Sequence, residues 1–183
     1  MSRDLDLTPD SSALLYQEFN RGNATDLMVL PMHANARPEV VLKTAFDESD
    51  GRFSPDGHWV SFTSDVSGRS EVYVARFPMR GTPIRVSRAG GSMARWRGDG
   101  RELTFLGPAG EIMAAAVAPK ADSLDFGAPQ FLFRTSEGIA SYELTADGHR
   151  FIVAANEIDP PPPVQLVLRW FHFSPLARRV VFE

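Results

Sequence analysis

A short block that ends one strand, turns and begins another recurs four times along this chain. Its fullest form is Ser54-Pro55-Asp56-Gly57, which precedes the apolar stretch 59–63. The aspartates of the four copies stand at positions 10, 56, 99 and 147. Repeats of roughly 40–50 residues that are built from short strands are typical of β-propellers, in which each repeat forms a four-stranded blade. We assign to the repeat turns Pro9, Asp10, Pro55, Asp56, Gly57, Asp99, Gly100, Asp147 and Gly148.

The residue types of this block suit a tight turn between antiparallel strands. Proline presets φ, aspartate hydrogen-bonds the nearby backbone, and glycine adopts a positive φ without a Cβ clash. We therefore place Gly57 in the left-handed region. Two copies depart from the pattern, because Ser11 replaces the turn glycine and Ala146 replaces the turn proline. A non-glycine residue at positive φ costs roughly 1–2 kcal/mol, so we expect the first repeat to be locally the least regular.

The second repeat predicts a whole blade, with further strands at 71–77 and 83–87 after the stretch 59–63. Apolar and polar residues do not alternate cleanly in these strands, as expected for a sheet that is buried on both faces. Helical periodicity is absent. The sequence therefore predicts an all-β fold, a β-propeller of about four blades of four antiparallel strands, with blades at approximately 4–45, 46–88, 89–136 and 137–173.

The segment from Thr44 to Leu103 resembles the TolB-like propeller repeats, most specifically in the Ser-Pro-Asp-Gly block with Ser64-Asp65 and in residues 68–74. More narrowly, it is similar to the C-terminal propeller region of some bacterial serine/threonine protein kinases and winged-helix regulators. The stretch 164–171 resembles the closing strand of that region, and the resemblance covers most of residues 4–173. Such propellers usually have more than four blades. The resemblance thus implies an incomplete ring, a fragment of a larger sensor or signalling protein.

Composition narrows the possible partners and compartments. The chain has a net charge of −4, and its 17 arginines are scattered rather than clustered, which argues against nucleic-acid binding. It has no cysteine, which excludes disulfides and thiolate metal sites. No secretory signal, lipidation motif or bilayer-length apolar run is visible, so we expect no membrane insertion by this segment. A resemblance to membrane-anchored sensors implies a periplasmic or other extracytoplasmic location, and otherwise the sequence fits the cytoplasm.

Two segments imitate catalytic motifs. Asp125-Phe126-Gly127 matches the metal-binding triplet of protein kinases, but the chain has no glycine-rich loop before Lys43 and no catalytic loop. We predict that 126–129 is a loop before an outer strand at 130–133. The segment 90–94 approximates the nucleophile elbow of serine hydrolases, which requires a preceding strand and a following helix. We interpret it as the link to an inner strand at 93–96, so the sequence predicts no catalytic residues.

Four other features leave alternatives open. His58 and His149 occupy equivalent places after the turn glycine, where a metal or phosphate site on the rim competes with two solvated side chains. The acidic residues Asp47, Glu48 and Asp50 either hold a hard cation near the channel or form a solvated loop, which we favour. The prolines at 160–163 either dock into an aromatic groove or form a stiff connector, which we also favour. We interpret three tryptophans as anchors between blades: Trp59, Trp96 and Trp170.

These observations favour a non-catalytic propeller module that binds a protein or a small ligand on a face lined by loops, without a metal or cofactor. The alternative is a regulatory propeller segment of an enzyme, either a serine/threonine kinase or a propeller-bearing peptidase, whose catalytic domain lies outside this chain. Open faces on the terminal blades would also favour self-association.

Overall fold

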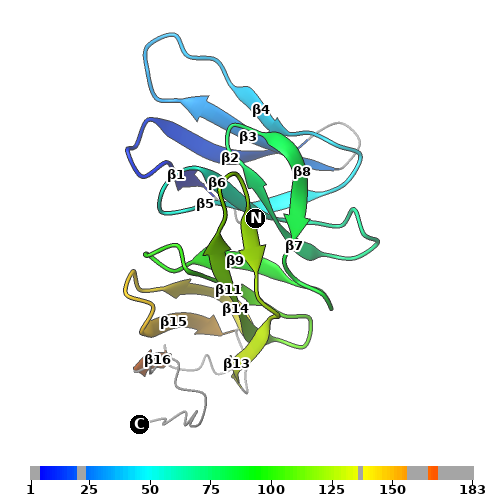
Figure 1. Ribbon diagram of the computed structural model, residues 1–183, viewed down its shortest axis with the longest axis vertical. Helices are drawn as coiled ribbons and strands as arrows, with labels where there is room; N and C mark the ends of the chain where they lie inside the picture. Colours follow the sequence, from blue (N-terminus) through cyan, green and yellow to red (C-terminus); the bar gives the residue numbers. More distant parts are fainter. Residues whose placement is uncertain (1–4, 20–23, 136–137, 156–164, 169–183) are drawn as a thin grey trace.

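The computed structural model describes residues 5–19, 24–135, 138–155 and 165–168 as a stack of four β-sheets (Figure 1). Within these ranges the chain forms sixteen strands and no helix, so the all-β prediction is confirmed. Accordingly, the described part of the chain offers no helix that could cross a membrane.

The first two sheets are each built from four antiparallel strands that follow one another in order along the chain. The first sheet contains β1 (Asp6–Leu7), β2 (Ala13–Phe19), β3 (Thr25–Pro31) and β4 (Glu39–Leu42). The second sheet contains β5 (Glu48–Phe53), β6 (Trp59–Ser64), β7 (Glu71–Arg76) and β8 (Arg80–Arg85).

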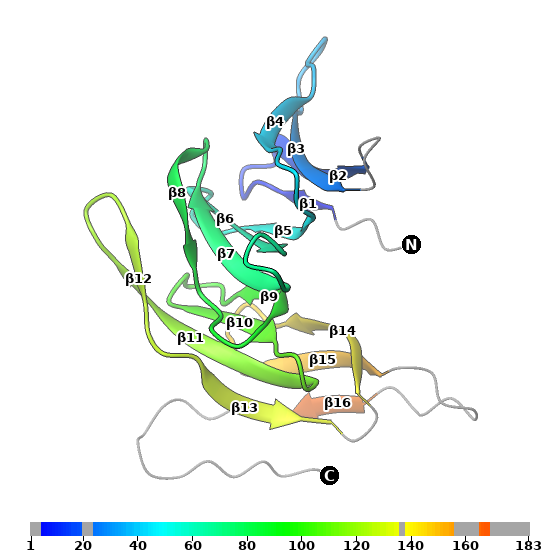
Figure 2. The same ribbon diagram turned by 90° about the vertical axis from the view of Figure 1, so that its right-hand side faces the viewer.

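The third and fourth sheets continue the same stack. The third contains β9 (Ser92–Trp96), β10 (Glu102–Leu106), β11 (Glu111–Pro119), β12 (Leu124–Phe126) and β13 (Gln130–Arg134). The fourth contains β14 (Ile139–Leu144), β15 (Arg150–Ala155) and β16 (Gln165–Leu168). In all four sheets the first strand is the inner one. Figure 2 shows β1, β5, β9 and β14 converging while the outer strands splay apart, as in the blades of a propeller.

Each gap between neighbouring sheets is filled by its own apolar cluster. The largest fully buried members include Leu15, Leu27 and Phe62 in the first gap, Val72, Leu103 and Phe105 in the second, and Ile112, Tyr142 and Phe151 in the third. The second sheet contributes to two clusters, because Phe62 packs toward the first sheet and Val72 toward the third. Every residue of β6 is consequently buried, which explains why its sequence lacks alternation.

The stack is open at both ends. The first and last sheets lie at opposite ends of the molecule in Figure 1, and large apolar side chains on them are exposed. Val40 of β4 is 56% exposed and Ile152 of β15 is 49% exposed. The described residues therefore form a partial β-propeller, an arc rather than a closed ring.

The strands differ from the sequence predictions in three places. In the third sheet, β11 is long enough to pair with both β12 and β13, so Phe126 ends a short strand instead of beginning a loop. In the second sheet, β8 begins at Arg80, three residues earlier than expected, because Arg80 already pairs with Arg76. Among the described residues, the fourth sheet has three strands.

Candidate binding pocket on the inner strands

The four repeat turns share one set of backbone hydrogen bonds. In the second sheet, the Gly57 N–H donates to Ser54 O at 2.9 Å, and the Ser54 N–H donates to Trp59 O at 2.8 Å. The same two bonds recur in the other three turns. In the first turn the Ser11 N–H donates to Thr8 O in the place of the glycine N–H, with a φ of 57° against 72° for Gly57. The first turn thus keeps the shape of the others, contrary to our expectation of irregularity, and Ser11 carries the backbone strain instead.

Each turn aspartate holds its turn in shape. Asp56 Oδ1 accepts the His58 N–H at 3.0 Å, and the same bond to the N–H two residues later forms at the other three aspartates. Hydrogen bonds from Ser12 and Thr8 lower the pKa of Asp10 to about 2. The remaining two aspartates also have pKa values below the ordinary range, because of bonds from Arg97 to Asp99 and from Thr145 to Asp147.

Successive turns touch one another and form a continuous rim. A Cβ added to Gly57 would lie 3.3 Å from Pro9 Cδ of the preceding turn. Between the third and fourth turns the approach is closer, because Gly98 N–H donates to Ala146 O at 3.0 Å and a Cβ at Gly98 would lie 2.4 Å from that oxygen. Proline cannot replace Gly98, since it has no N–H to donate.

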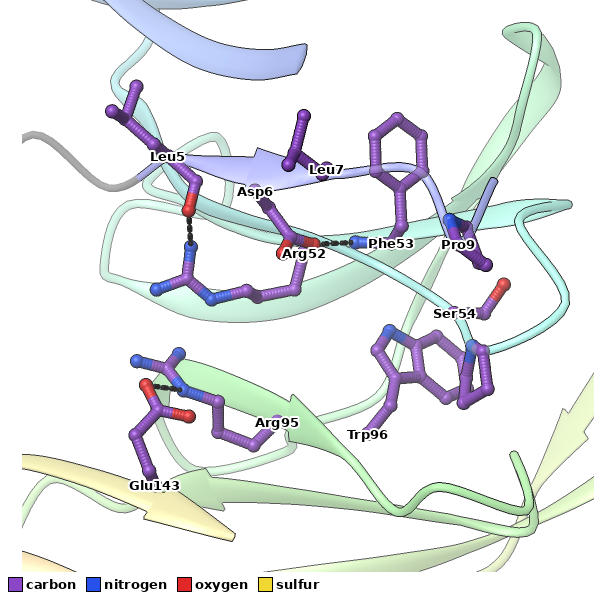
Figure 3. A pocket seen from close by; sticks show the side chains of 11 residues that line it. Leu5, Asp6, Leu7, Pro9, Arg52, Phe53, Ser54, Arg95, Trp96 and Glu143 are labelled. Carbon is purple, nitrogen blue, oxygen red and sulfur yellow. Dashed lines mark hydrogen bonds and ion pairs between the residues drawn. The ribbon is translucent and has the colours of Figure 1, made fainter. Parts of the chain in front are cut away.

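A pocket of about 390 Å³ opens beside this rim, and we call it the channel pocket. Its walls come from the inner strands of all four sheets and from the first two turns (Figure 3). The volume lies within the roughly 300–1,000 Å³ that is typical of small-molecule sites. The residues that line it are Leu5, Asp6, Leu7, Pro9, Arg52, Phe53, Ser54, Pro55, Arg95, Trp96 and Glu143.

Four charged residues of the channel pocket occupy one position of the repeat, four residues before the turn aspartate. They are Asp6 on β1, Arg52 on β5, Arg95 on β9 and Glu143 on β14. Arg95 Nε donates to Glu143 Oε1 at 2.9 Å, and Asp6 Oδ2 accepts the Phe53 N–H at 2.7 Å. Burial raises the pKa of Asp6, while the Phe53 N–H and the charge of Arg52 oppose that rise.

Arg95 is held firmly by its surroundings. Its side chain is only 9% exposed, its Nη1 donates to Ala94 O at 3.0 Å, and its guanidinium lies 5.6 Å from the centre of the Tyr142 ring. Tyr142 is itself fully buried and shares a 3.1 Å hydrogen bond with Thr104. Burial raises the pKa of Tyr142, so its ring stays neutral beneath the cation.

Of the three acidic residues, Asp47 lies in the link before β5, whereas Glu48 and Asp50 lie on β5 itself. Glu48 is 1% exposed and accepts a 2.5 Å hydrogen bond from Thr44, while Asp47 Oδ1 accepts the Thr25 N–H at 2.9 Å. Asp50 Oδ2 accepts from Thr63 at 3.1 Å and from the backbone of the next inner strand. The expected solvated loop is thus wrong for Glu48, which is buried, and for Asp50, which connects β5 to β9, whereas Asp47 is exposed in the link. Within the described ranges, no three His, Cys, Asp or Glu residues could hold a metal.

The segments that imitate catalytic motifs lie apart from the channel pocket. Asp125 is on β12, where its carboxylate forms an exposed ion pair with Lys120 at 2.6 Å. The segment 90–94 links the second sheet to β9. A Cβ on Gly91 would lie 2.9 Å from the Phe105 ring, so packing between sheets explains this glycine.

The remaining candidates have mixed outcomes. His58 and His149 are exposed at equivalent rim positions, on turns that touch other turns rather than each other. Trp59 is buried in the gap between the second and third sheets, as expected for an anchor, whereas Trp96 also lines the channel pocket. Trp170 and the prolines at 160–163 lie outside the described residues.

Arg52 and Arg95 are site residues that were not predicted from the sequence. A usable signal was present, because both precede a turn aspartate by four residues, and aligning the four repeats on that aspartate places them in one column with Asp6 and Glu143. Four charged residues at an inner-strand position are unusual, since inner strands are mostly enclosed.

No protein-family model matches the chain, and no curated protein matches its sequence. Solved structures do match its fold. TolB from Acinetobacter baumannii is 20% identical with a TM-score of 0.63, over 91% of this chain and 43% of that one. The Dos1 propeller is 13% identical with a TM-score of 0.56, over 81% and 38%. A puromycin-hydrolyzing peptidase from Mycobacterium tuberculosis is 19% identical with a TM-score of 0.60, over 89% and 28%.

These likenesses show the fold. The chain spans less than half the length of each of these three proteins. Its four sheets have the architecture of a TolB-like β-propeller, as the sequence predicts, and the narrower resemblance to the propellers of kinases and winged-helix regulators is not shown.

Proposed function

We propose that this chain is a non-catalytic β-propeller module that binds its ligand, either a small molecule or a segment of a partner protein, in the channel pocket. The observation that supports this proposal is the position of the pocket, which all four inner strands and the rim line together. A site shared by every repeat depends on the arc as a whole. Its lining combines apolar side chains with four charged ones, and such polar groups fix the orientation of a ligand in a binding pocket.

The module belongs, in this proposal, to a larger sensor or signalling protein. Two observations support that context. The chain corresponds to less than half of TolB from Acinetobacter baumannii and of the Dos1 propeller, and both ends of the arc expose apolar side chains that a further blade would cover. A bacterial kinase or winged-helix regulator with a C-terminal propeller fits both observations.

The second candidate is a regulatory propeller segment of an enzyme. It is favoured by the similarity to the puromycin-hydrolyzing peptidase, of which this chain covers 28%. In that case the channel pocket would admit or position a substrate for a catalytic domain elsewhere in the protein. The two candidates differ in whether the bound compound is altered by the full-length protein.

Fragment binding to the full 183-residue chain tests the proposal. A fragment set with acidic, basic and neutral members is titrated into the ¹⁵N-labelled chain and followed by NMR. We expect some fragments to shift signals of pocket residues and to lose binding in Leu7→Trp, which fills the pocket. Val66→Trp is the matched control, because Val66 is 47% exposed and Leu7 is 46% exposed, yet Val66 lies outside the pocket. Failure of every fragment, or equal binding to both variants, would refute the proposal.

A further inference from the structure

The charges of the channel pocket follow an order along the arc, with two arginines in the middle and one carboxylate at each end. The outer pairs are compensated. Arg95 forms its 2.9 Å ion pair with Glu143, and Asp6 is stabilised by the charge of Arg52. Between these pairs, Arg52 and Arg95 lie on the adjacent strands β5 and β9 and place two like charges at the middle of the pocket. The middle of the pocket is therefore the part where an anion gains most.

The two guanidinium groups are positioned before any ligand arrives. Arg52 Nη1 donates to Leu5 O at 3.3 Å and to Gly51 O at 3.2 Å, while Arg95 is held by Ala94 O, Glu143 and the Tyr142 ring. Figure 3 shows both side chains extending toward the same side of the pocket. A guanidinium has five N–H donors, and the two hydrogen bonds of Arg95 use two of them. Its other donors remain for a ligand, with little side-chain entropy left to lose.

Trp96 supplies an independent sign of a ligand. Its Nε1 is buried and has no hydrogen-bond partner among the described residues, although it belongs to a residue that lines the pocket. A buried indole N–H usually has a partner, and an unpaired buried donor costs roughly 1–3 kcal/mol. An acceptor bound in the pocket would satisfy it. The second, third and fourth inner strands thus contribute only donors or already paired carboxylates to the centre of the site.

We propose that the channel pocket binds the carboxylate of a small monoanionic ligand between Arg52 and Arg95, with Trp96 Nε1 donating a further hydrogen bond. This inference rests on the proposed function and specifies its ligand class. A planar carboxylate matches the fork of an arginine side chain. Leu5, Leu7 and the prolines of the first two turns form an apolar wall for the rest of the ligand.

The carboxylates at the two ends restrict the ligand's charge. Asp6 and Glu143 flank the arginines, so a dianion gains attraction at the centre but meets repulsion at both ends. A compound with one carboxylate and an apolar body fits this distribution better than a phosphate monoester. The selection is electrostatic, and it weakens as salt increases.

The test uses three compounds with one shared body: 3-phenylpropionate, its neutral amide, and phenethyl phosphate. Each is titrated into the full chain while the three tryptophan indole N–H signals are followed by NMR, with Trp96 assigned by Trp96→Phe. We expect 3-phenylpropionate to shift the Trp96 signal and to bind about tenfold or more tightly than the amide. It should also bind more tightly than the phosphate.

Three variants connect this preference to the residues. Arg52→Gln should weaken binding of 3-phenylpropionate about tenfold or more, because a hydrogen bond to a charged group is lost. Trp96→Phe keeps an aromatic ring but removes the indole N–H, and it should weaken binding of 3-phenylpropionate about two- to tenfold. Arg85→Gln, on exposed β8 outside the pocket, is the control and should bind as the parent chain does.

The outcomes separate this inference from the proposed function. If the amide or the phosphate binds as tightly as the carboxylate, or if Arg52→Gln binds like Arg85→Gln, the assignment to monocarboxylates is wrong. The proposed function still stands in that case, provided that Leu7→Trp blocks the compounds that do bind. If no compound of any class perturbs the pocket, both proposals fail.

Discussion

Two links, one after the first sheet and one after the second, each contact a buried glutamate of the second sheet. The two glutamates have opposite hydrogen-bonding environments. In the first joint, residues 43–47, Glu48 accepts one hydrogen bond from Thr44, and its Oε2 is buried without a hydrogen-bond partner. In the second joint, residues 86–91, Glu71 accepts hydrogen bonds from Ser87, from the Gly90 N–H at 3.0 Å and from Arg69 at 2.7 Å. Both side chains are 1% exposed or less.

The difference appears in the pKa values of the two carboxyl groups. Burial raises the pKa of Glu48, and one hydrogen bond from Thr44 does not reverse it. Burial acts on Glu71 in the same direction, but the bonds from Ser87, Arg69 and Gly90 outweigh it and lower the pKa. Burial alone therefore does not decide the charge of a joint. The hydrogen-bond donors and the neighbouring charges decide it together, because Asp26 and Asp65 further raise the pKa of Glu48 while Arg69 lowers that of Glu71.

Replacing each glutamate by the isosteric glutamine should give the largest difference in stability between the two joints. Glu71→Gln should lower the free energy of unfolding by about 2–4 kcal/mol, because its charge satisfies two buried donors, Ser87 and the Gly90 N–H, and forms an ion pair with Arg69. Glu48→Gln should change it by less than about 1 kcal/mol, since the neutral amide oxygen can still accept from Thr44. Urea unfolding of the parent and of both variants at neutral pH measures the two values.

The control for this pair is Glu39→Gln, because Glu39 is an exposed glutamate on β4. It should unfold with the parent midpoint. Equal losses of unfolding free energy in Glu71→Gln and Glu48→Gln would contradict the comparison, because the two glutamates would then contribute equally to stability.

The fold followed from the sequence because its strongest signals are local. The turn of the second sheet requires Pro55, Asp56 and Gly57 in adjacent positions, and the spacing of its copies sets the blade length. The joints were harder to predict, since Glu71 meets Ser87 and Gly90 across 16 and 19 residues. Glu48 belongs to an acidic run that is typical of solvated loops, and only packing between sheets shows that it is buried.

The channel pocket could not be predicted from the sequence for a related reason. Arg52 and Arg95 are 43 positions apart, and only the stacking of β5 on β9 brings them to one cavity. The strand order within the third sheet was also not predictable, because β12 forms only where the long β11 extends beyond β10. Local residue types give no signal for such an extension.

Replacing the residue at the positive-φ turn position by valine should destabilise the second sheet more than the first. The expected loss of stability is smaller than that of Glu71→Gln. Gly57 has a φ of 72°, which a β-branched residue rarely adopts, and its added Cβ would lie 3.3 Å from Pro9 Cδ. Ser11 already carries a side chain at a φ of 57°. Gly57→Val should thus lower stability by about 1–3 kcal/mol, and Ser11→Val by less. Thermal melts of the two variants compare them, and equal midpoint shifts would contradict the inferred difference between the turns.

The smallest expected effect is a difference in pH dependence between the two joints. The pKa of Glu71 in the folded chain lies below the ordinary 4.5, so its contribution to stability is complete above about pH 4.5 and is lost as the pH falls through the folded value. The pKa of Glu48 lies above 4.5. The folded chain therefore holds a proton there that the unfolded chain has released, and stability declines as the pH rises through that window.

The matched glutamine variants isolate the two contributions. Glutamine does not titrate, so the difference in unfolding free energy between parent and variant reports the glutamate alone. From about pH 3 to about pH 7, the advantage of the parent over Glu71→Gln should grow, whereas its advantage over Glu48→Gln should shrink. Urea unfolding at intervals across this range gives both slopes. Slopes of the same sign would show that the two carboxyl groups share one environment, and the opposition between the joints would then be wrong.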